Sequence, residues 1–548
     1  MGFGIALDLG TSGFRTHLVD LANNGKIIST AITMRHPLPG ANIMDHLHFW
    51  LENGSEVGHT IIIDTVDRLI SLHNVDSSEI ERMAICGNPA QLSMFENVEL
   101  RDLAYAGQTL LNRLNVAVPS RRAHTILAEE LGLKSVRANA EVRIPPSIRH
   151  EIGADALAMI LKSNLLNSKE NCMVTDYGTN AEMGLFHDGE LYTGSAAAGP
   201  AMEGQSINFG MLAAPQAISD IIIEPDGYWT NKVLDQSLDA KTGDTVNPVG
   251  GEVKFRTGVK ARGITGTGVV AVVAMGLETG IINLPNIRSF DKKIHLQNAV
   301  SISEYDVREA GKAMGAIRAG HRTLIEEVGI RDEEMQTMYL AGASGTYVDP
   351  IKAQTVGLVP RSIEKTVQIG NTSLMMAYDL LTQDEGMDKM QAAADSIASK
   401  HIMFATSRIF EDLYVNEIAY WLEGMSIEKF NSLLIKGGYQ PMPKIRRPKT
   451  TQRIVSRDIP VIGNLGLKTL DNIGSYLIKE FQGCTGCKKC MKECPECAIN
   501  IEKIEENRFR VRIMTELCLG TACKKCESVC SQEIFKFSDL EIVKKAAG

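Results

Sequence analysis

Short apolar runs that end in polar, glycine-rich turns open the chain. Residues 3–7 (Phe-Gly-Ile-Ala-Leu) predict a buried strand, which ends at the turn 8–13. A second strand is predicted over 14–20 and a third from Lys26, with Asn23-Asn24-Gly25 between them. Asn-Gly between two apolar runs is the strongest short-range signal for a β-hairpin. The chain therefore begins with strands that fold back on one another.

The same pattern returns further along the chain. An apolar run over 172–176 again ends in Asp-x-Gly-Thr, a strand is predicted over 181–186, and the turn His-Asp-Gly follows. A long helix is expected over about 305–328. A strand over 338–340 and the small-residue turn 341–345 come after it. The repeat of one hairpin device indicates two related halves.

Composition narrows the class of protein. The 548 residues suggest three or four domains at about 150 residues each. A net charge of −9 and only 5% aromatic residues disfavour nucleic-acid binding. The apolar stretch around 263–277 is shorter than the roughly 18–20 residues of a membrane span, so it predicts a buried helix. No basic segment precedes the first apolar run, so we expect a cytoplasmic protein without membrane contact.

The two Asp-x-Gly-Thr turns point to phosphate chemistry. Glycine lets the backbone approach phosphate oxygens, and hydroxyl and N–H groups donate to them. An aspartate at the strand end can hold Mg²⁺ or position a nucleophile. One such turn could be a plain hairpin, but two copies on matched hairpins favour nucleotide binding. A P-loop is excluded, because Gly-Lys-Ser/Thr occurs nowhere in the chain.

Nine of the eleven cysteines lie between Cys484 and Cys530. They form the groups Cys-x2-Cys-x2-Cys-x3-Cys-Pro and Cys-x4-Cys-x2-Cys-x3-Cys, a spacing that favours 4Fe–4S clusters. Residues 482–540 resemble bacterial-type two-cluster ferredoxins, in which the fourth cysteine of each group binds the other cluster. The resemblance implies one cluster on Cys484, Cys487, Cys490 and Cys530, and a second on Cys518, Cys523, Cys526 and Cys494.

Other uses of these cysteines fit less well. Disulfides are disfavoured in a reducing cytosol. Zinc sites usually pair two Cys-x2-Cys units or add histidine, and this segment has no histidine. The segment departs from the ferredoxin pattern in the x4 gap after Cys518 and in Ser531, which replaces a proline. Three further cysteines are expected to be packed thiols: Cys497, Cys86 and Cys172.

Each cysteine group contains a lysine pair, Lys488-Lys489 and Lys524-Lys525. Such a pair is compatible with a solvated surface. It is also compatible with a docking face for an acidic partner or with tuning of the cluster potential.

The turns and the helix together resemble the phosphate-one, phosphate-two and adenosine motifs of the actin, sugar-kinase and Hsp70 ATPase superfamily. The resemblance implies an α/β fold whose two lobes close on Mg-ATP. It implies catalytic roles for Asp8 and Asp176 and a place near the base or ribose for Lys312. The remaining nucleotide-binding residues that it implies are Gly10, Thr11, Ser12, Gly178, Thr179, Asn180, Gly342, Ala343 and Ser344.

Longer segments narrow this resemblance to ATP-dependent reductive activators of corrinoid proteins. The matching segments are 86–89, 176–182, 197–204, 263–268 and 369–374, and the likeness covers nearly all of residues 1 to about 440. Some members carry a plant-type 2Fe–2S domain before the ATPase part. Here two 4Fe–4S motifs follow it, which is similar to activases of methylamine methyltransferase corrinoid proteins in methanogenic archaea.

The resemblance implies a reaction. A protein-bound corrinoid is reduced from inactive Co(II) to active Co(I) at the cost of ATP, which reactivates a methylamine:coenzyme M methyl-transfer system. The corrinoid is expected on a separate partner protein, because the signature Asp-x-His-x2-Gly is absent here. The sequence does not identify the low-potential electron donor. An uphill gap of roughly 250 mV costs about 6 kcal/mol for one electron, and ATP helps only by favouring one bound state.

Other functions remain open. An ATP-dependent activator of another low-potential enzyme, such as a radical dehydratase, would also join an ATPase to iron–sulfur clusters. An ATP-switched binding or assembly protein could use the ferredoxin part for docking alone. A plain sugar kinase would leave the cysteine groups without a role.

We expect four parts along the chain. Residues 1–170 and 171–442 form the two ATPase lobes, 443–481 a basic linker, and 482–548 an α+β ferredoxin domain. Six basic residues against one acid between 443 and 458 indicate a solvated linker or a partner-binding stripe. Residues 458–479 are expected to join the ferredoxin part as strand and helix.

Overall fold

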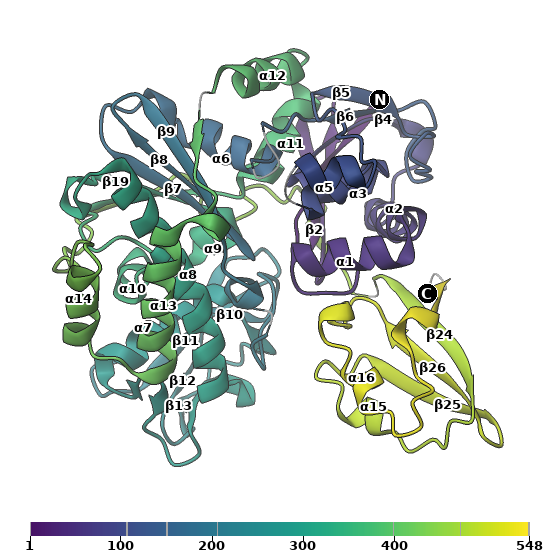
Figure 1. The fold of residues 1–548 in the computed structure, drawn as a ribbon. Helices are drawn as coiled ribbons and strands as arrows, with labels where there is room; N and C mark the ends of the chain where they lie inside the picture. The colour runs from purple at the N-terminus through teal and green to yellow at the C-terminus, as the bar shows by residue number, and fades with distance from the viewer. Residues whose placement is uncertain are drawn as a thin grey trace. The chain divides into compact units, whose positions relative to one another are not determined.

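The computed structural model describes residues 2–105, 108–148, 152–204, 206–397, 399–471 and 473–545 (Figure 1). The chain divides into two compact units. The first unit comprises residues 1–154, 377–391 and 463–548, and the second comprises 155–376 and 392–462.

The first unit is built on a seven-stranded sheet of order β23-β3-β2-β1-β4-β6-β5. Strands β1 to β3 form the predicted antiparallel meander, and β4 and β6 continue the sheet parallel to β1. The central strand β1 is apolar because it is covered on both faces: Ile5 and Leu7 on one face and Ala6 on the other are fully buried. The strands are β1 (Phe3–Leu9), β2 (Phe14–Asp20), β3 (Lys26–Thr33), β4 (Ile80–Gly87), β5 (His124–Leu127), β6 (Glu141–Ile144) and β23 (Leu467–Leu470).

The second unit repeats this topology. Its large sheet has the order β21-β9-β8-β7-β19-β20-β22, so a meander is again followed by two parallel strands. The strands are β7 (Cys172–Tyr177), β8 (Asn180–His187), β9 (Glu190–Ala197), β19 (Thr337–Ala341), β20 (Lys365–Gly370), β21 (Ser399–His401) and β22 (Thr450–Arg453). The shared order confirms the expectation of two related α/β halves.

A five-stranded sheet and two short strand pairs complete the second unit. The sheet, of order β13-β12-β11-β10-β14, contains β10 (Ala217–Ile223), β11 (Trp229–Leu234), β12 (Ala240–Val246), β13 (Val253–Phe255) and β14 (Gly263–Ile264). The pairs are β15 (Ile282–Asn283) with β16 (Asn286–Ile287), and β17 (Lys293–His295) with β18 (Ser301–Ser303).

Helices pack on these sheets, and in the second unit α8 and α13 run side by side (Figure 1). The helices in the N-terminal part of the first unit are α1 (Ile43–Asn53), α2 (Ser55–Ser71), α3 (Pro89–Glu96), α4 (Arg101–Ala104) and α5 (Gln108–Arg113). The later ones are α6 (Ala154–Ser163), α7 (Gly266–Thr279), α8 (Glu304–Val328), α9 (Gly342–Tyr347), α10 (Pro350–Val356), α11 (Thr372–Thr382), α12 (Gly386–Ser396), α13 (Arg408–Glu423) and α14 (Ile427–Lys436).

The cysteine-rich part is a small α+β domain inside the first unit. Its antiparallel sheet has the order β25-β26-β24-β27, from β24 (Ser475–Gln482), β25 (Ile499–Glu505), β26 (Arg508–Met514) and β27 (Glu541–Lys544). Two one-turn helices, α15 (Lys489–Lys492) and α16 (Lys525–Ser528), pack together and carry cysteines of the two groups.

The apolar stretch around 263–277 is the buried helix α7, as expected. Its residues from Gly266 to Gly276 are all buried, and Thr265 caps its start by accepting a hydrogen bond from the Gly268 N–H. No helix among the described residues is long and apolar enough to cross a membrane.

Each unit is built from separate stretches of the sequence, whereas the expected parts followed one another along the chain. Residues 377–391 lie in the first unit, where Arg143 donates to the carbonyl of Leu380 at 2.6 Å and Tyr378 donates to that of Gly25 at 2.7 Å. The segment 443–481, expected as a linker, supplies β22 to one large sheet and β23 to the other. Within residues 458–471 and 473–479 the structure has strands and no helix.

Candidate functional site

The first candidate nucleotide turn lies at the end of β1. Asp8 is buried, and its carboxylate lies 3.7 Å from the Arg15 guanidinium on β2. A Cβ at Gly10 would stand 2.8 Å from the carbonyl oxygen of Gly13, so only glycine fits this tight turn. Thr11 and Ser12 complete the turn, with Ser12 buried. The four implied residues of this half therefore lie together at one strand end.

Asn88 joins this turn, although it was not among the site residues that the sequence implied. Parallel pairing of β1 with β4 sets Leu9 opposite Gly87, which brings the end of β4 beside the turn. The Asn88 amide donates to the Thr11 hydroxyl at 3.0 Å and also caps α3 by accepting from the Gln91 N–H at 2.9 Å. Asn-Pro after a buried strand is a helix-start signal that could have marked this residue.

The second candidate turn joins β7 to β8 and contacts α9. Gly342 has φ +76°, and a Cβ there would stand 2.1 Å from Oδ1 of Asp176, so the carboxylate lies directly against this glycine. Ser344, on the same helix, donates to the carbonyl of Met202 at 2.9 Å. Three segments distant in sequence, at 176–180, 200–203 and 342–344, therefore come together in the second unit.

Glu203 is a further acid at this turn that sequence reasoning missed. Its carboxylate accepts from the backbone N–H of Thr179 at 2.9 Å and from the Thr179 hydroxyl at 2.5 Å. A Cβ at Gly178 would lie 3.9 Å from the same carboxylate, and Asn180 begins β8 immediately after. The threonine hydroxyl is thus held by an acid rather than turned to solvent.

Several carboxylates lie near one another in this part of the second unit. Burial raises the pKa of Glu182 well above its usual value, and the charges of Asp155, Asp176 and Glu203 raise it further. Such a concentration of negative charge suits a divalent cation, because Mg²⁺ prefers carboxylate and water oxygens. As these carboxylates stand, no three of them among the described residues are arranged to hold a metal ion directly.

Lys312 lies on α8, as expected, but its ammonium is engaged on its own helix. It forms an ion pair with Glu309 at 2.6 Å, and the side chain is about half exposed. Among the described residues, no hydrogen bond joins it to Gly342, Ala343 or Ser344.

Four cysteines, the set implied for the second cluster, line one pocket of the cysteine-rich domain. They are Cys494, Cys518, Cys523 and Cys526. The N–H of Gly520 donates to the Cys518 sulfur and that of Ala498 to the Cys494 sulfur, each at 3.3 Å. Burial raises the pKa of Cys518 and of Cys526 to about 12, and the neighbouring sulfurs add to this effect. Thiolates so crowded are stable only with bound cations, and N–H groups aimed at sulfur are typical of iron–sulfur sites.

The other group is the set implied for the first cluster, Cys484, Cys487, Cys490 and Cys530. Burial raises the pKa of Cys490, and the nearby Cys484 and Cys487 raise it too, so these three cysteines lie in one neighbourhood. Burial opposes ionisation of Cys530, but the backbone N–H groups of residues 532–535 outweigh it and lower its pKa. Among the described residues, no three His, Cys, Asp or Glu side chains are arranged to hold a metal ion as they stand. The assignment of Cys530 to the first cluster remains a prediction.

The two cysteine loops share a backbone conformation. Lys488 and Lys524 both have positive φ, +58° and +40°, and each precedes a one-turn helix that carries the next cysteine. Lys524 lies 3.9 Å from Glu52 on α1. Cys497 is exposed rather than packed, which corrects the expectation for it, whereas Cys86 and Cys172 are fully buried as expected.

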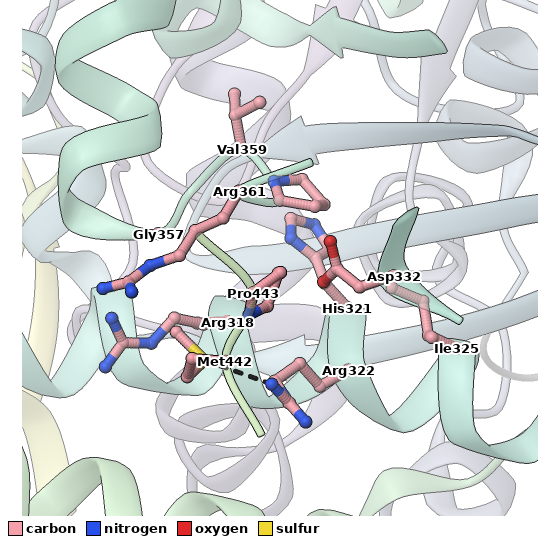
Figure 2. Close-up of a pocket in the computed structure, with 11 residues that line it drawn as sticks. Arg318, His321, Arg322, Ile325, Asp332, Gly357, Val359, Arg361, Met442 and Pro443 are labelled. Atoms are coloured by element: carbon pink, nitrogen blue, oxygen red, sulfur yellow. Dashed lines mark hydrogen bonds between the residues drawn. The ribbon is translucent and has the colours of Figure 1, made fainter. Parts of the chain in front are cut away.

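A separate pocket in the second unit lies among α8 and the segments 357–361 and 442–443 (Figure 2). Burial lowers the pKa of its His321 to about 3, so this ring is neutral, and its Nε2 lies 2.8 Å from the Thr175 hydroxyl on β7. Arg318 pairs with Glu417 of α13, and Arg322 bonds Met442 and the Gln440 carbonyl. These contacts tie α8 to α13 and to the segment 440–442, while the buried Nε atom of Arg361, which also lines the pocket, has no hydrogen-bond partner among the described residues.

Comparison with known proteins adds family relationships. The model for the "RACo middle region" matches residues 3–168, and the model for the "C-terminal domain of RACo the ASKHA domain" matches residues 170–432. A [Co(II) methylated amine-specific corrinoid protein] reductase from Methanosarcina barkeri is 46% identical over 95% of this chain and 96% of its own. Corrinoid activation enzyme RamQ from Eubacterium limosum is 24% identical over 75% of this chain and 69% of its own.

A solved structure shares the fold. The reductive activator for the corrinoid, iron–sulfur protein superposes with a TM-score of 0.62 at 24% identity. The match covers 76% of this chain and 66% of that one, just under two thirds of its length.

Proposed function

Because this chain belongs to the RACo family of reductive activators, we propose that it uses ATP to reduce a protein-bound corrinoid from Co(II) to Co(I). The corrinoid is a substrate carried by a separate partner protein. The finer identification, a corrinoid protein of a methylamine:coenzyme M methyl-transfer system, is supported by 46% identity along almost the whole of a relative named for methylated amines.

One observation carries the proposal. A duplicated phosphate-turn fold and a cysteine-rich domain occur in one chain, and the cysteine-rich domain packs against the half that holds the first turn. The carbonyl of Cys518 accepts a hydrogen bond at 2.8 Å from Gly40, in the segment between β3 and α1. An ATPase and an electron carrier so joined suit an electron transfer that does not run downhill unaided.

The electron count is simple. One electron from a low-potential donor converts one Co(II) to Co(I), and ATP hydrolysis yields ADP and phosphate without itself supplying an electron. When bound, 4Fe–4S clusters on the eight cysteines pass single electrons. ATP acts by favouring one conformation of the activator–corrinoid protein complex, because a ligand shifts an equilibrium only by its differential affinity for the two states.

The protein's own residues have distinct tasks in nucleotide binding. Gly10 and Gly178 let the backbone come close to phosphate oxygens, and Thr11, Ser12, Thr179 and Asn180 supply donors. Asp8 and Asp176 hold Mg²⁺ or its water ligands. Since Glu203 accepts the Thr179 hydroxyl in the structure, a phosphate must compete with this acid for the hydroxyl.

The test is anaerobic visible spectroscopy of the iron-reconstituted protein with a Co(II) corrinoid protein and a low-potential reductant. We expect the Co(I) absorption band to appear only with hydrolysable ATP. An Asp176→Asn variant should lose the reaction and retain its cluster spectrum. A matched change at the exposed hairpin turn, Asp188→Asn, should leave the rate unchanged.

Two outcomes would contradict the proposal. If Co(I) formed equally well without ATP, the coupling would be wrong. If ATP were hydrolysed with no Co(I), the partner class would be wrong, and radical dehydratases would be the next substrates to try. An ATP-switched assembly protein would bind its partner without any reduction.

A further inference from the structure

A chain of hydrogen bonds, partly buried at Asn88 and fully buried at Gln91, leads from the first nucleotide turn to residues 36–40 within the first unit. Asn88 bonds the Thr11 hydroxyl at one end and the Gln91 backbone at the other, at 3.0 and 2.9 Å. The side chain of Gln91 is fully buried and reaches two histidines. Its Oε1 lies 3.0 Å from Nε2 of His36, and its Nε2 lies 3.1 Å from Nδ1 of His46.

The direction of each bond is fixed. The Leu38 N–H donates to Nδ1 of His36 at 3.2 Å, so Nε2 of His36 carries the hydrogen and donates to Gln91. The Gln91 amide then donates to His46, whose ring stacks on that of His36 with centroids 3.9 Å apart. Burial lowers the pKa of His36 to about 4 and lowers that of His46 well below its usual value, so both rings are neutral near pH 7.

The far end of this chain holds the cysteine-rich domain. The carbonyl of Pro37 accepts from the Thr515 hydroxyl at 2.8 Å, and the N–H of Gly40 donates to the carbonyl of Cys518 at 2.8 Å. Thr515 is fully buried and also accepts from the Ser475 N–H. Residues 36–40 are therefore bonded to Gln91 on one side and to the backbone of a cluster cysteine on the other.

We propose that Gln91 is a positioning residue that couples nucleotide binding at Thr11 to the electron affinity of the cluster on Cys494, Cys518, Cys523 and Cys526. This rests on the proposed function, which takes Thr11 as a phosphate contact and these cysteines as iron ligands. When phosphate draws the Thr11 hydroxyl, Asn88 and the start of α3 respond, and Gln91 passes the shift through His36 to residues 37–40. Backbone dipoles around a cluster tune its potential, so a change in the Gly40–Cys518 contact changes the ease of reduction.

This coupling can be measured, because nucleotide binding and cluster reduction are thermodynamically linked. If the nucleotide changes the reduction equilibrium of the cluster, reduction must change nucleotide affinity by the same factor. For a one-electron couple, a tenfold change in affinity equals a 59 mV shift in potential.

The experiment uses the full-length, iron-loaded protein and the Mg complex of a non-hydrolysable ATP analogue. Its Kd is measured for the oxidised and the dithionite-reduced protein, and the midpoint potential is followed by EPR with and without the analogue. We expect the two Kd values to differ at least threefold in the wild type, equal to about 28 mV. In Gln91→Leu their ratio should fall to one, with intact cluster spectra and a Kd for oxidised protein within threefold of the wild type.

A matched control separates coupling from general loss of a buried amide. Gln297 in the second unit is also fully buried and bonds the Asp244 N–H at 2.6 Å and the Val259 carbonyl at 2.9 Å. Gln297→Leu should keep the wild-type ratio of Kd values.

A second pair of variants tests the far end of the chain and decides the matter if Gln91→Leu does not fold. Thr515→Val removes the hydrogen bond to Pro37 and should bring the ratio of the two Kd values to one. Thr515→Ser keeps the hydroxyl and should give the wild-type ratio. A wild-type ratio of one, or a wild-type ratio retained in either Gln91→Leu or Thr515→Val, would overturn the coupling. If one of these results is found while Co(I) formation still depends on ATP, the coupling is wrong and the proposed function is unaffected. A protein that binds neither nucleotide nor iron would instead refute the proposed function.

Discussion

Gly342 faces the Asp176 carboxylate with a hydrogen atom where any other residue has a carbon. A Cβ there would stand 2.1 Å from Oδ1 of Asp176, and the positive φ of +76° adds a backbone penalty of about 1–2 kcal/mol for an L-residue. We expect Gly342→Ala to push Asp176 aside and to weaken Mg-nucleotide binding more than tenfold. Isothermal titration with a non-hydrolysable ATP analogue measures the effect.

Gly329 offers a matched control for this change. It ends α8 with φ +77°, nearly the same backbone strain, but a Cβ there meets nothing within 4 Å. Gly329→Ala should therefore lower stability by a similar 1–2 kcal/mol and leave nucleotide affinity unchanged. Equal losses of affinity in the two variants would show that strain alone, and not the Asp176 contact, is responsible.

At this scale the sequence predicted the residues of the turns but not their neighbours. One local pattern, a strand that ends in Asp-x-Gly-Thr, is enough to predict Asp8, Gly10, Asp176 and Gly178, because the pattern spans only about six residues. Glu203 reaches Thr179 across 24 residues and Asn88 reaches Thr11 across 77. Such contacts depend on which strands pair, and no local pattern reports that.

Between elements, a buried ion pair joins α8 to α13. Arg318 bonds Glu417 at 2.7 Å, with 4% and 1% of the two side chains exposed. Glu417→Ala leaves the guanidinium buried without its counter-charge, which should cost about 3–5 kcal/mol of unfolding free energy in the second unit. Thermal unfolding followed by circular dichroism measures it.

The ion pair of Lys449 with Glu364 is the exposed counterpart in the same unit. Glu364→Ala should change stability by no more than about 0.5 kcal/mol, because solvent screens such a pair. If Glu417→Ala were equally mild, the buried pair would contribute little to the packing of the two helices.

The sheet of the first unit encloses histidines that should make it sensitive to acid. Burial lowers the pKa of His17 on β2 to about 3, and it lowers the pKa of His73, after α2, to about 3 as well. Unfolded histidine binds a proton near pH 6.5, so between about pH 6.5 and pH 4 the unfolded state binds protons that the folded state does not. Stability should therefore fall with falling pH by about 1.4 kcal/mol per unit for each histidine.

Trp50 on α1 is the single tryptophan of the first unit and can report this unfolding once Trp229 and Trp421 are replaced by Phe. The urea midpoint should drop steeply from pH 7 to pH 5. In His17→Asn the slope of unfolding free energy against pH should be smaller by about one proton. An unchanged slope would mean that His17 is already protonated in the folded unit.

The strands of the hairpins were predictable because turn chemistry and apolar runs mark them locally. The edge strands β22 and β23 were not. All four residues of β22, Thr450–Arg453, are exposed, and they lie in the basic stretch that predicted a linker. Edge strands are held by backbone hydrogen bonds to a partner far away in the sequence, and such bonds require no apolar side chains.

At the scale of the whole molecule, the segment that leads to the cysteine-rich domain is also part of the ATPase fold. Strand β23 pairs with β3 from Leu467 opposite Thr30 to Leu470 opposite Thr33. A chain shortened to end at residue 471 keeps this strand, whereas one ended at 462 leaves β3 as an open edge. We expect the first unit of the longer version to be more stable by about 2 kcal/mol, since each lost bond costs about 1 kcal/mol.

Denaturant unfolding followed through Trp50 compares the two shortened chains. Both lack the cysteine-rich domain and expose residues 36–40 alike, so their difference reports β23. Equal midpoints would show that β23 adds nothing to the sheet and that the ATPase part ends before residue 463.

The return of β23 to the first sheet also fixes an order of events on the ribosome. The chain enters the first unit at its start, comes back at 377–391 and again at 463, so the first sheet cannot be completed until residue 470 has been synthesised. The second sheet needs only residues 172–453. The half that is translated first is therefore finished last, and the cysteines emerge after nearly all of the surface on which their domain rests. We therefore expect iron to be inserted only after the strands that support these cysteines have been synthesised.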